Sequence, residues 1–259
     1  MTTTALGLAL RWPGRVLLAE CDPGGRGILP GYLADRLSGP PGPGLLGVTM
    51  MPRGGASVES LPDLDKLVLP VEDERVGLLH GLRDPRQVAQ VSECWPQLAA
   101  ALAGRDGDVI ADLGRFGGPD TPVPLLRAAE MVVMVLRPTL PQIDAAVPRI
   151  GMLRELVGDR AKLGLCLISL GPYTAGEVTS ALKVPMLGRL PHSRKEASVL
   201  SDGARPSIAF RTSLLMRSLD SLGRAVRSTL EEARAAQAGE HDSNESSRER
   251  AATAAGERR

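Results

Sequence analysis

The chain has 259 residues, of which 43% are hydrophobic, so it is long enough for one large α/β domain or two small ones. Its formal net charge of +1 gives no general attraction to nucleic acid or to membranes, and no stretch is apolar for long enough to cross a bilayer. Cys21, Cys94 and Cys166 are dispersed and contain no Cys-x-x-Cys pair, which indicates neither zinc nor a disulfide framework. We therefore expect small buried thiols in a reducing, cytoplasmic protein.

The first two dozen residues predict a helix that begins at once, a short turn and a buried strand followed by two acidic residues, Glu20 and Asp22. Thr2, Thr3 and Thr4 offer hydroxyl and backbone N–H groups at the start of that helix. Unpaired donors and the helix dipole favour a phosphate or another anion there. The pattern therefore predicts half of a nucleotide site, and the other half would be a strand and a glycine-rich loop with a lysine.

The next segment, residues 24–44, is dense in glycine and proline, which predicts a surface loop with a short helix at 28–37. Short apolar runs at 45–51, 67–70 and 76–80 predict strands near a sheet edge. Apolar residues at helical spacing predict a helix from Asp84 or Pro85 to Leu102.

A buried strand is predicted to carry Asp112 at its carboxyl end. Parallel sheets bind ligands outside the carboxyl ends of their strands, so Asp112 is expected to face the same crevice as Glu20 and Asp22. Three converging carboxylates suit a Mg²⁺ site. The alternative is a purely structural cluster whose charge is offset by Arg26 or Arg115.

From there on, strands and helices alternate, which predicts an α/β fold with a doubly wound, mostly parallel sheet flanked by helices. The expected elements are a helix at 122–129, a strand at 130–136, a helix at 140–157, a strand at 162–170, a helix to 182 started by a Thr174–Glu177 capping box, a strand at 184–190, a helix at 194–200 and a final helix at 207–236. Residues 1–236 are thus expected to form one domain. Residues 237–259 are polar without an apolar stripe and are predicted to be a disordered tail.

Residues Thr2–Ala9 and Val16–Pro23 resemble the first helix and the acidic D-x-D-P strand end of the ParA/MinD family of deviant-Walker P-loop ATPases. Asp108–Gly114 looks like the Walker B strand of that family, and Leu187–Pro191 looks like its last sheet strand and nucleotide-base loop. The order and spacing of these segments agree with the family over residues 1 to 230.

The chain departs from the family pattern where its chemistry would lie. Met1 falls at the position of the phosphate-loop lysine, and the first lysine in the sequence is Lys66, so the Walker A motif is degenerate. Either the start codon is misplaced and the native protein carries an extra strand and loop, or the chain is a degenerate relative without turnover. Loss of a central strand would leave two neighbours with unpaired buried backbone groups, which favours the first explanation.

The resemblance implies ATP and Mg²⁺ as cofactors. Thr2 would bind the metal with Asp112 behind it, Thr3 would hold a phosphate, and Asp22 would act as the catalytic residue that orients the attacking water. The cofactor-binding residues would be Thr2, Thr3, Thr4, Glu20 and Pro191. Glu20 replaces the first aspartate of the family motif, and without the lysine we expect weak or absent nucleotide binding and no meaningful turnover.

The resemblance also implies a homodimer with a protein partner, which partitions chromosomes or positions another cellular assembly. One alternative is a non-catalytic scaffold of a secretion or pilus machine. Another is a nonspecific DNA-binding module that uses arginines late in the chain, namely Arg211, Arg217, Arg224 and Arg227.

Overall fold

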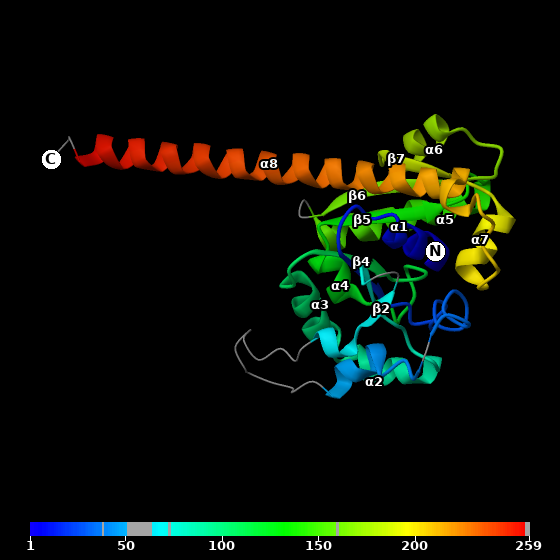
Figure 1. The fold of residues 1–259 in the computed structure, drawn as a ribbon. Helices are drawn as coiled ribbons and strands as arrows, with labels where there is room; N and C mark the ends of the chain where they lie inside the picture. Colours follow the sequence, from blue (N-terminus) through cyan, green and yellow to red (C-terminus); the bar gives the residue numbers. More distant parts are fainter. Residues whose placement is uncertain (38, 51–63, 72–73, 159–160, 257–259) are drawn as a thin grey trace.

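The strands of the computed structural model form two sheets (Figure 1). The model describes residues 1–37, 39–50, 64–71, 74–158 and 161–256. The first sheet has the order β2-β3-β1-β4 and the second the order β5-β6-β7. Their strands are β1 (Val16–Glu20), β2 (Leu69–Val71), β3 (Val76–Leu79), β4 (Asp108–Asp112), β5 (Met131–Leu136), β6 (Lys162–Ser169) and β7 (Met186–Pro191). All pairings are parallel except β2 with β3, so the predicted fold class is confirmed, with the difference that the strands divide into two sheets.

Helices follow most strands, as the alternating pattern predicts. They are α1 (Thr2–Leu10), α2 (Val88–Ser92), α3 (Trp95–Ala103), α4 (Val123–Ala128), α5 (Leu140–Val157), α6 (Ala175–Leu182), α7 (Arg194–Ser201) and α8 (Leu214–Gly256), with short 3₁₀ segments η1 (Gly44–Met50), η3 (Leu64–Leu67), η4 (Pro85–Gln87) and η5 (Phe210–Thr212). The predicted capping box of α6 is present, because Thr174 accepts a hydrogen bond from the N–H of Glu177 and Glu177 accepts one from the N–H of Thr174. In the described part of the chain, no helix is long and apolar enough to cross a membrane.

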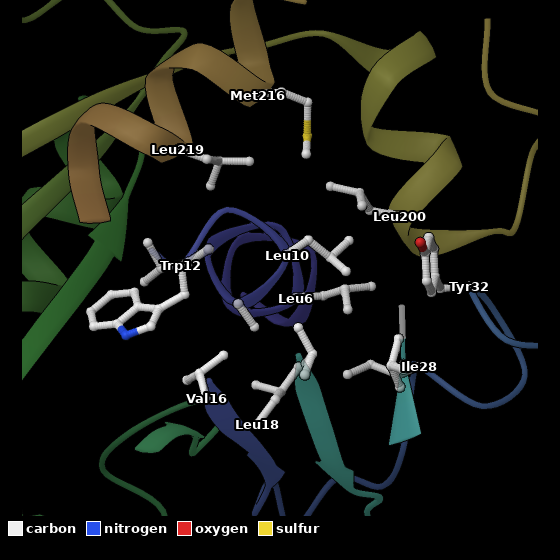
Figure 2. Packing of buried hydrophobic residues seen from close by; sticks show 14 of the residues in the cluster. Leu6, Leu10, Trp12, Val16, Leu18, Ile28, Tyr32, Leu200, Met216 and Leu219 are labelled. Carbon is white, nitrogen blue, oxygen red and sulfur yellow. The ribbon is translucent and has the colours of Figure 1, made fainter. Parts of the chain in front are cut away.

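Helix α1 is enclosed by apolar side chains from several elements, as Figure 2 shows. Leu6 and Leu10 belong to one core cluster with Leu18 of β1 and with Leu200 and Leu219 of α7 and α8. The side chains of this helix are apolar on nearly all sides, which is typical of a helix that is buried on nearly all sides. It therefore holds the start of the chain in a fixed position.

On each face, apolar residues of both sheets pack against the same core cluster. On one face, Ile110 of β4 and Val133 of β5 pack against the cluster around α1. On the other face, Leu113 and Val132 pack against a cluster formed by residues of α4 and α5. The apolar core is thus continuous across β4 and β5, although these two strands belong to different sheets.

Three predicted elements differ from the structure. Residues 45–50 of the run 45–51 belong to the 3₁₀ segment η1, because the N–H of Leu45 bonds to the carbonyl oxygen of His80 and buried Leu45 and Val48 are spaced by three residues. Residue 51 of that run lies outside the described residues. The helix predicted at 28–37 is a series of turns, and the helix predicted from Asp84 is divided into η4, α2 and α3.

The final helix begins later and ends later than predicted. It starts at Leu214, after η5, and α8 continues to Gly256 without a break at residue 236. In Figure 1 its second half extends away from the rest of the chain. Residues 257–259 lie outside the described part, and the disorder of 237–259 in solution stays a prediction.

Candidate functional site

The amino end of α1 lies at the carboxyl end of β4. The hydroxyl group of Thr2 donates a 2.6 Å hydrogen bond to Oδ2 of Asp112, and the N–H of Gly114 donates a 3.2 Å bond to Oδ1. Asp112 is 4% exposed, and its position is fixed by the pairing of β1 with β4, in which Glu20 lies opposite Asp112. The two oxygen ligands proposed for a metal are therefore adjacent.

Asp22 lies at the same rim of the sheet. Its Oδ1 accepts a 2.7 Å hydrogen bond from the N–H of Gly24. Gly114 has a φ of +63°, and a Cβ atom built on it would lie 2.1 Å from the carboxyl carbon of Asp22. The carboxylate of Asp22 is thus packed against the backbone that follows Asp112, and the structure brings Thr2, Asp22 and Asp112 together as the sequence predicts.

Glu20 is engaged by the backbone of two loops. It accepts hydrogen bonds from the N–H groups of Gly27, Ile28 and Gly81, at 2.8, 2.9 and 3.1 Å, and is 1% exposed. Burial raises the pKa of Glu20; the three N–H groups lower it in part, and the negative charge of Asp112 raises it further. Glu20 therefore joins the loop after β1 to the loop after β3, and its role in binding a cofactor stays a prediction.

A pocket of about 360 Å³ lies beside the amino end of α1. Its lining residues include Thr3, Thr4, Pro191, Arg137, His192 and Arg194. Three of the predicted cofactor-binding residues therefore share one pocket. Sequence reasoning placed Arg194 at the ligand edge but missed Arg137; the available signal was that Arg137 directly follows the last residue of β5, at the ligand edge of a parallel sheet.

Charged groups of both signs lie near the start of α1. Glu20, Asp22 and Asp112 lie at the rim where Thr2 bonds to Asp112, and exposed Arg137 and Arg194 line the pocket that Thr3 also lines. Among the described residues, no ion pair joins Arg26 or Arg115 to these carboxylates. The arrangement suits a ligand with a divalent cation at one end and an anionic group at the other.

The donor set fits Mg²⁺ in combination with a phosphate. Mg²⁺ prefers oxygen ligands and is held by one or two protein groups together with phosphate oxygens and water, which Thr2 and Asp112 can satisfy. In the part of the chain that could be searched, no group of three or more His, Cys, Asp or Glu residues forms a metal cage. A pair of oxygen ligands such as Thr2 and Asp112 suits a metal that arrives with its ligand.

The start of α1 can receive an anion. The N–H groups of Thr4 and Ala5 bond to the carbonyl oxygen of Met1, which leaves those of Thr2 and Thr3 at the open end of the helix. Among the described residues that line the adjacent pocket there is no lysine. Arg137 and Arg194 line this pocket and can supply positive charge to a phosphate.

No family model and no curated protein matches this sequence. Solved structures do match. The cell division ATPase MinD of Pyrococcus furiosus is 16% identical, with 88% of this chain and 93% of that chain covered and a TM-score of 0.67. The septum site-determining protein MinD of Pyrococcus horikoshii, complexed with Mg-ADP, is 16% identical over 87% and 88%, with a TM-score of 0.63. A ParA family ATPase of Chlorobium tepidum is 16% identical over 86% and 89%, with a TM-score of 0.60.

The two mostly parallel sheets and their covering helices define an α/β protein. Within that class, the chain has the ParA/MinD-like fold that the order of its sequence motifs predicts. At these identities the likeness establishes the fold, and the activity has to be argued from the site itself.

Proposed function

We propose that this chain is a cytoplasmic ParA/MinD-like protein that binds a Mg²⁺–nucleotide and positions or partitions a cellular assembly. The observation that carries the proposal is the 2.6 Å hydrogen bond from Thr2 to Asp112, at the rim where Asp22 also lies. The MinD protein of Pyrococcus horikoshii, which has the same fold, is complexed with Mg-ADP. That complex supports a nucleotide as the ligand of the corresponding rim here.

Each residue of the rim has a part in this proposal. Thr2 and Asp112 would hold Mg²⁺, whose charge would neutralise the phosphates when it is bound. The N–H groups at the start of α1, with Thr3, would bind a phosphate. Arg137 and Arg194 would supply the positive charge that a lysine supplies in the family, and Pro191 would border the base.

Asp22 is the proposed positioning group for an attacking water, since its carboxylate is half-buried at the same rim. Orienting a water requires that the phosphate be held rigidly. Arginines in an open pocket hold a phosphate less rigidly than a loop wrapped around it. We therefore propose weak nucleotide binding with little turnover in the chain of 259 residues.

Binding of a fluorescent ATP analogue in the presence of Mg²⁺ tests the site. We expect Thr2→Val and Asp112→Asn each to weaken binding at least tenfold, and Arg137→Ala to weaken it and to reduce its salt dependence. Thr179→Val, on α6 and remote from the rim, is the matched control, because the hydroxyl of Thr179 bonds only to the carbonyl oxygen of Gly176. A folded chain that binds no nucleotide at millimolar concentration would refute the proposal.

Dimerisation and a protein partner belong to the same proposal. A homodimer that forms with Mg²⁺–ATP, and not without it, would be seen as a doubling of mass in sedimentation or light scattering. A monomer under both conditions would contradict this part of the proposal.

A non-catalytic scaffold is the second candidate, and the absence of lysine from the described lining of the pocket favours it. Nucleotide binding without measurable hydrolysis, unchanged by Asp22→Asn, is the result expected of a scaffold. Loss of a slow hydrolysis on Asp22→Asn is the result expected of an ATPase.

A DNA-binding module is less well supported by the charges of α8. Arg224 lies 3.7 Å from Asp220, and Arg227 lies 3.5 Å from Glu231, so acidic side chains accompany these arginines. Nonspecific binding depends on uncompensated positive charge and decreases steeply with salt. This candidate would be supported if the chain were retained on nonspecific DNA at low salt and the double variant Arg217→Ala, Arg224→Ala were not.

A further inference from the structure

A second pocket, of about 360 Å³, lies between β7 and the start of α8, two elements that lie next to each other in Figure 1. Its lining residues are Gly188, Arg189, Leu214, Arg217, Ser218 and Ser221. None of them lines the pocket beside the start of α1, although β7 and α8 contribute residues to both. This second pocket, the β7–α8 pocket, is therefore a site that the proposed function does not use.

The sequence builds the β7–α8 pocket from one helix face and one strand. The lining residues of α8 are spaced by three or four positions and so share a face, namely Leu214, Arg217, Ser218 and Ser221. Gly188 allows α8 to approach β7 closely, because a Cβ atom on it would lie 3.0 Å from Cδ1 of Leu222. Arg189 follows Gly188 in β7, so this close contact brings Arg189 and Arg217 to one pocket.

The two arginines of the pocket have no acidic partner within the described residues. No hydrogen bond or ion pair of the described chain involves the guanidinium group of Arg189 or Arg217, and both residues are exposed. Asp220, which lies between the lining serines in the sequence of α8, pairs instead with Arg11 at 3.6 Å and with Arg224 at 3.7 Å. The pocket therefore carries two positive charges that the described residues do not neutralise.

Serine hydroxyls add neutral donors beside the arginines. Oγ of Ser221 accepts a 3.2 Å hydrogen bond from Arg224, so its own proton can be donated to a ligand. The hydroxyl of Ser218 has no hydrogen bond to any described residue. Guanidinium and hydroxyl donors at one place are the groups that bind carboxylates and other oxyanions.

The strand that supplies Arg189 forms an edge of its sheet. In the order β5-β6-β7, the described strands pair with β7 on one side only, so its outer N–H and C=O groups can pair with an added strand. Apolar groups lie beside the arginines as well, since Leu214 is 60% exposed and Met186, at the start of β7, is 38% exposed. An extended peptide can use all of these features, through main-chain pairing, apolar contacts and carboxylates.

A nucleic acid would use the charges of this pocket and leave the strand edge and the apolar groups without partners. The net charge of +1 also gives the chain little general attraction to a polyanion. The combination of an open strand edge, exposed Leu214 and two unneutralised arginines therefore favours a peptide.

We propose that the β7–α8 pocket binds an extended acidic segment of a partner protein. The segment pairs with the outer edge of β7, its carboxylates bind Arg189 and Arg217, and one of its apolar side chains contacts Leu214. The partner is thus a protein with an exposed, acidic, strand-forming segment. This inference does not rest on nucleotide binding, because none of the residues involved lines the pocket beside α1.

Fluorescence anisotropy of a labelled peptide in which Glu and Val alternate tests the charges. We expect the full chain to bind it, and Arg189→Gln and Arg217→Gln each to weaken binding at least about tenfold, because a charge-assisted contact is lost. Replacement of every Glu of the peptide by Gln is expected to have a similar effect. Arg127→Gln, at an exposed position of α4, is the matched control and is expected to leave binding unchanged.

Hydrogen exchange tests the pairing with β7. We expect the bound peptide to slow the exchange of outward N–H groups of β7 at least about tenfold and to leave β2, at the edge of the other sheet, unchanged. Binding without protection of β7 would overturn the inference. Unfolding temperatures of the arginine variants equal to that of the parent chain show that any loss of binding is local.

Absence of peptide binding at millimolar concentration would overturn the inference, and so would binding that both arginine variants retain in full. Random-sequence duplex DNA is the competing probe. DNA that binds when the peptide does not, and is lost in both arginine variants, would assign the pocket to nucleic acid and would also overturn the inference. No readout involves nucleotide, so a failure here is distinct from a failure of the proposed function.

Discussion

Thr2 and Asp112 are 110 residues apart in the sequence, yet the hydroxyl of Thr2 lies 2.6 Å from Oδ2 of Asp112. The bond joins the first helical residue of the chain to the carboxyl end of β4. Asp112 is buried, and its two oxygens accept these bonds separately: Oδ2 from the hydroxyl of Thr2 and Oδ1 from the N–H of Gly114. The contact therefore contributes to the fold as well as to the proposed site.

We expect Thr2→Val to lower the free energy of unfolding by about 1–3 kcal/mol, because a buried carboxylate loses a hydrogen-bond partner while the shape of the side chain is kept. Thr179→Val, which removes a hydroxyl bonded to a backbone carbonyl on α6, is expected to cost less than about 1 kcal/mol. Urea unfolding of both variants measures the difference. Equal losses of free energy of unfolding would show that the Thr2–Asp112 bond contributes no more to stability than the bond of Thr179.

Glu20 gives a prediction for pH. Because burial raises its folded-state pKa above the ordinary 4.5, the folded chain binds the proton more tightly than the unfolded chain. This group therefore reduces stability as pH rises from about 4.5 through the raised pKa. We expect Glu20→Gln to flatten the pH dependence of the free energy of unfolding in that window, as measured by urea unfolding at several pH values.

The same substitution has a cost that does not depend on pH. An amide NH₂ group would face the N–H of Gly81 in place of the oxygen that now accepts its bond. Glu155→Gln, at an exposed position of α5, is the control for loss of a surface carboxylate. A pH profile of Glu20→Gln parallel to that of the parent chain would contradict the assignment of the raised pKa to Glu20.

Elements with strong local signals could be predicted from the sequence. The apolar residues of β5 and the Thr174–Glu177 capping box of α6 determine their own structure, and both are found where expected. The meeting of Asp22 with Asp112 could also be predicted, because parallel strands place their carboxyl ends at one edge. These inferences need only local pattern and one rule of topology.

The remainder depends on contacts that local pattern does not encode. The run at 45–51 has the composition of a strand, and the 3₁₀ form of residues 45–50 depends on the bond of Leu45 to the carbonyl oxygen of His80. The N–H partners of Glu20 come from the loops after β1 and β3, whose paths the sequence does not show. Arg137 enters the pocket because β5 lies near α1 in space, not in sequence.

The three thiols lead to a chemical prediction. Cys21, Cys94 and Cys166 are free and buried, and burial raises the pKa of Cys166 to about 12 and that of Cys21 still further above its ordinary value. The thiolate is the reactive form, so we expect none of the three to react with a thiol reagent until the chain unfolds. Ser180→Cys, at an exposed position of α6, is expected to react within the mixing time. Rapid reaction of the parent chain would show that its core opens readily.

Two helical glycines provide a matched test of the packing around α1. A Cβ atom on Gly7 would lie 2.5 Å from Cδ1 of Leu219 and 3.1 Å from Cδ1 of Leu200, whereas a Cβ atom on Gly151 of α5 would meet nothing within 4 Å. We expect Gly7→Ala to destabilise the chain by about 1–3 kcal/mol, because α7 and α8 must move away from α1.

Gly151→Ala is expected to stabilise the chain by about 0.5–1 kcal/mol, because alanine favours a helix over glycine and no side chain obstructs it. Thermal and urea unfolding measure the change in stability of each variant. The two changes have opposite signs if α1 is packed as described. A stabilising effect of both substitutions would mean that α1 lies farther from α8 than the contacts of Gly7 indicate. The Thr2–Asp112 bond would then lose its support, since the rest of α1 holds Thr2 in place.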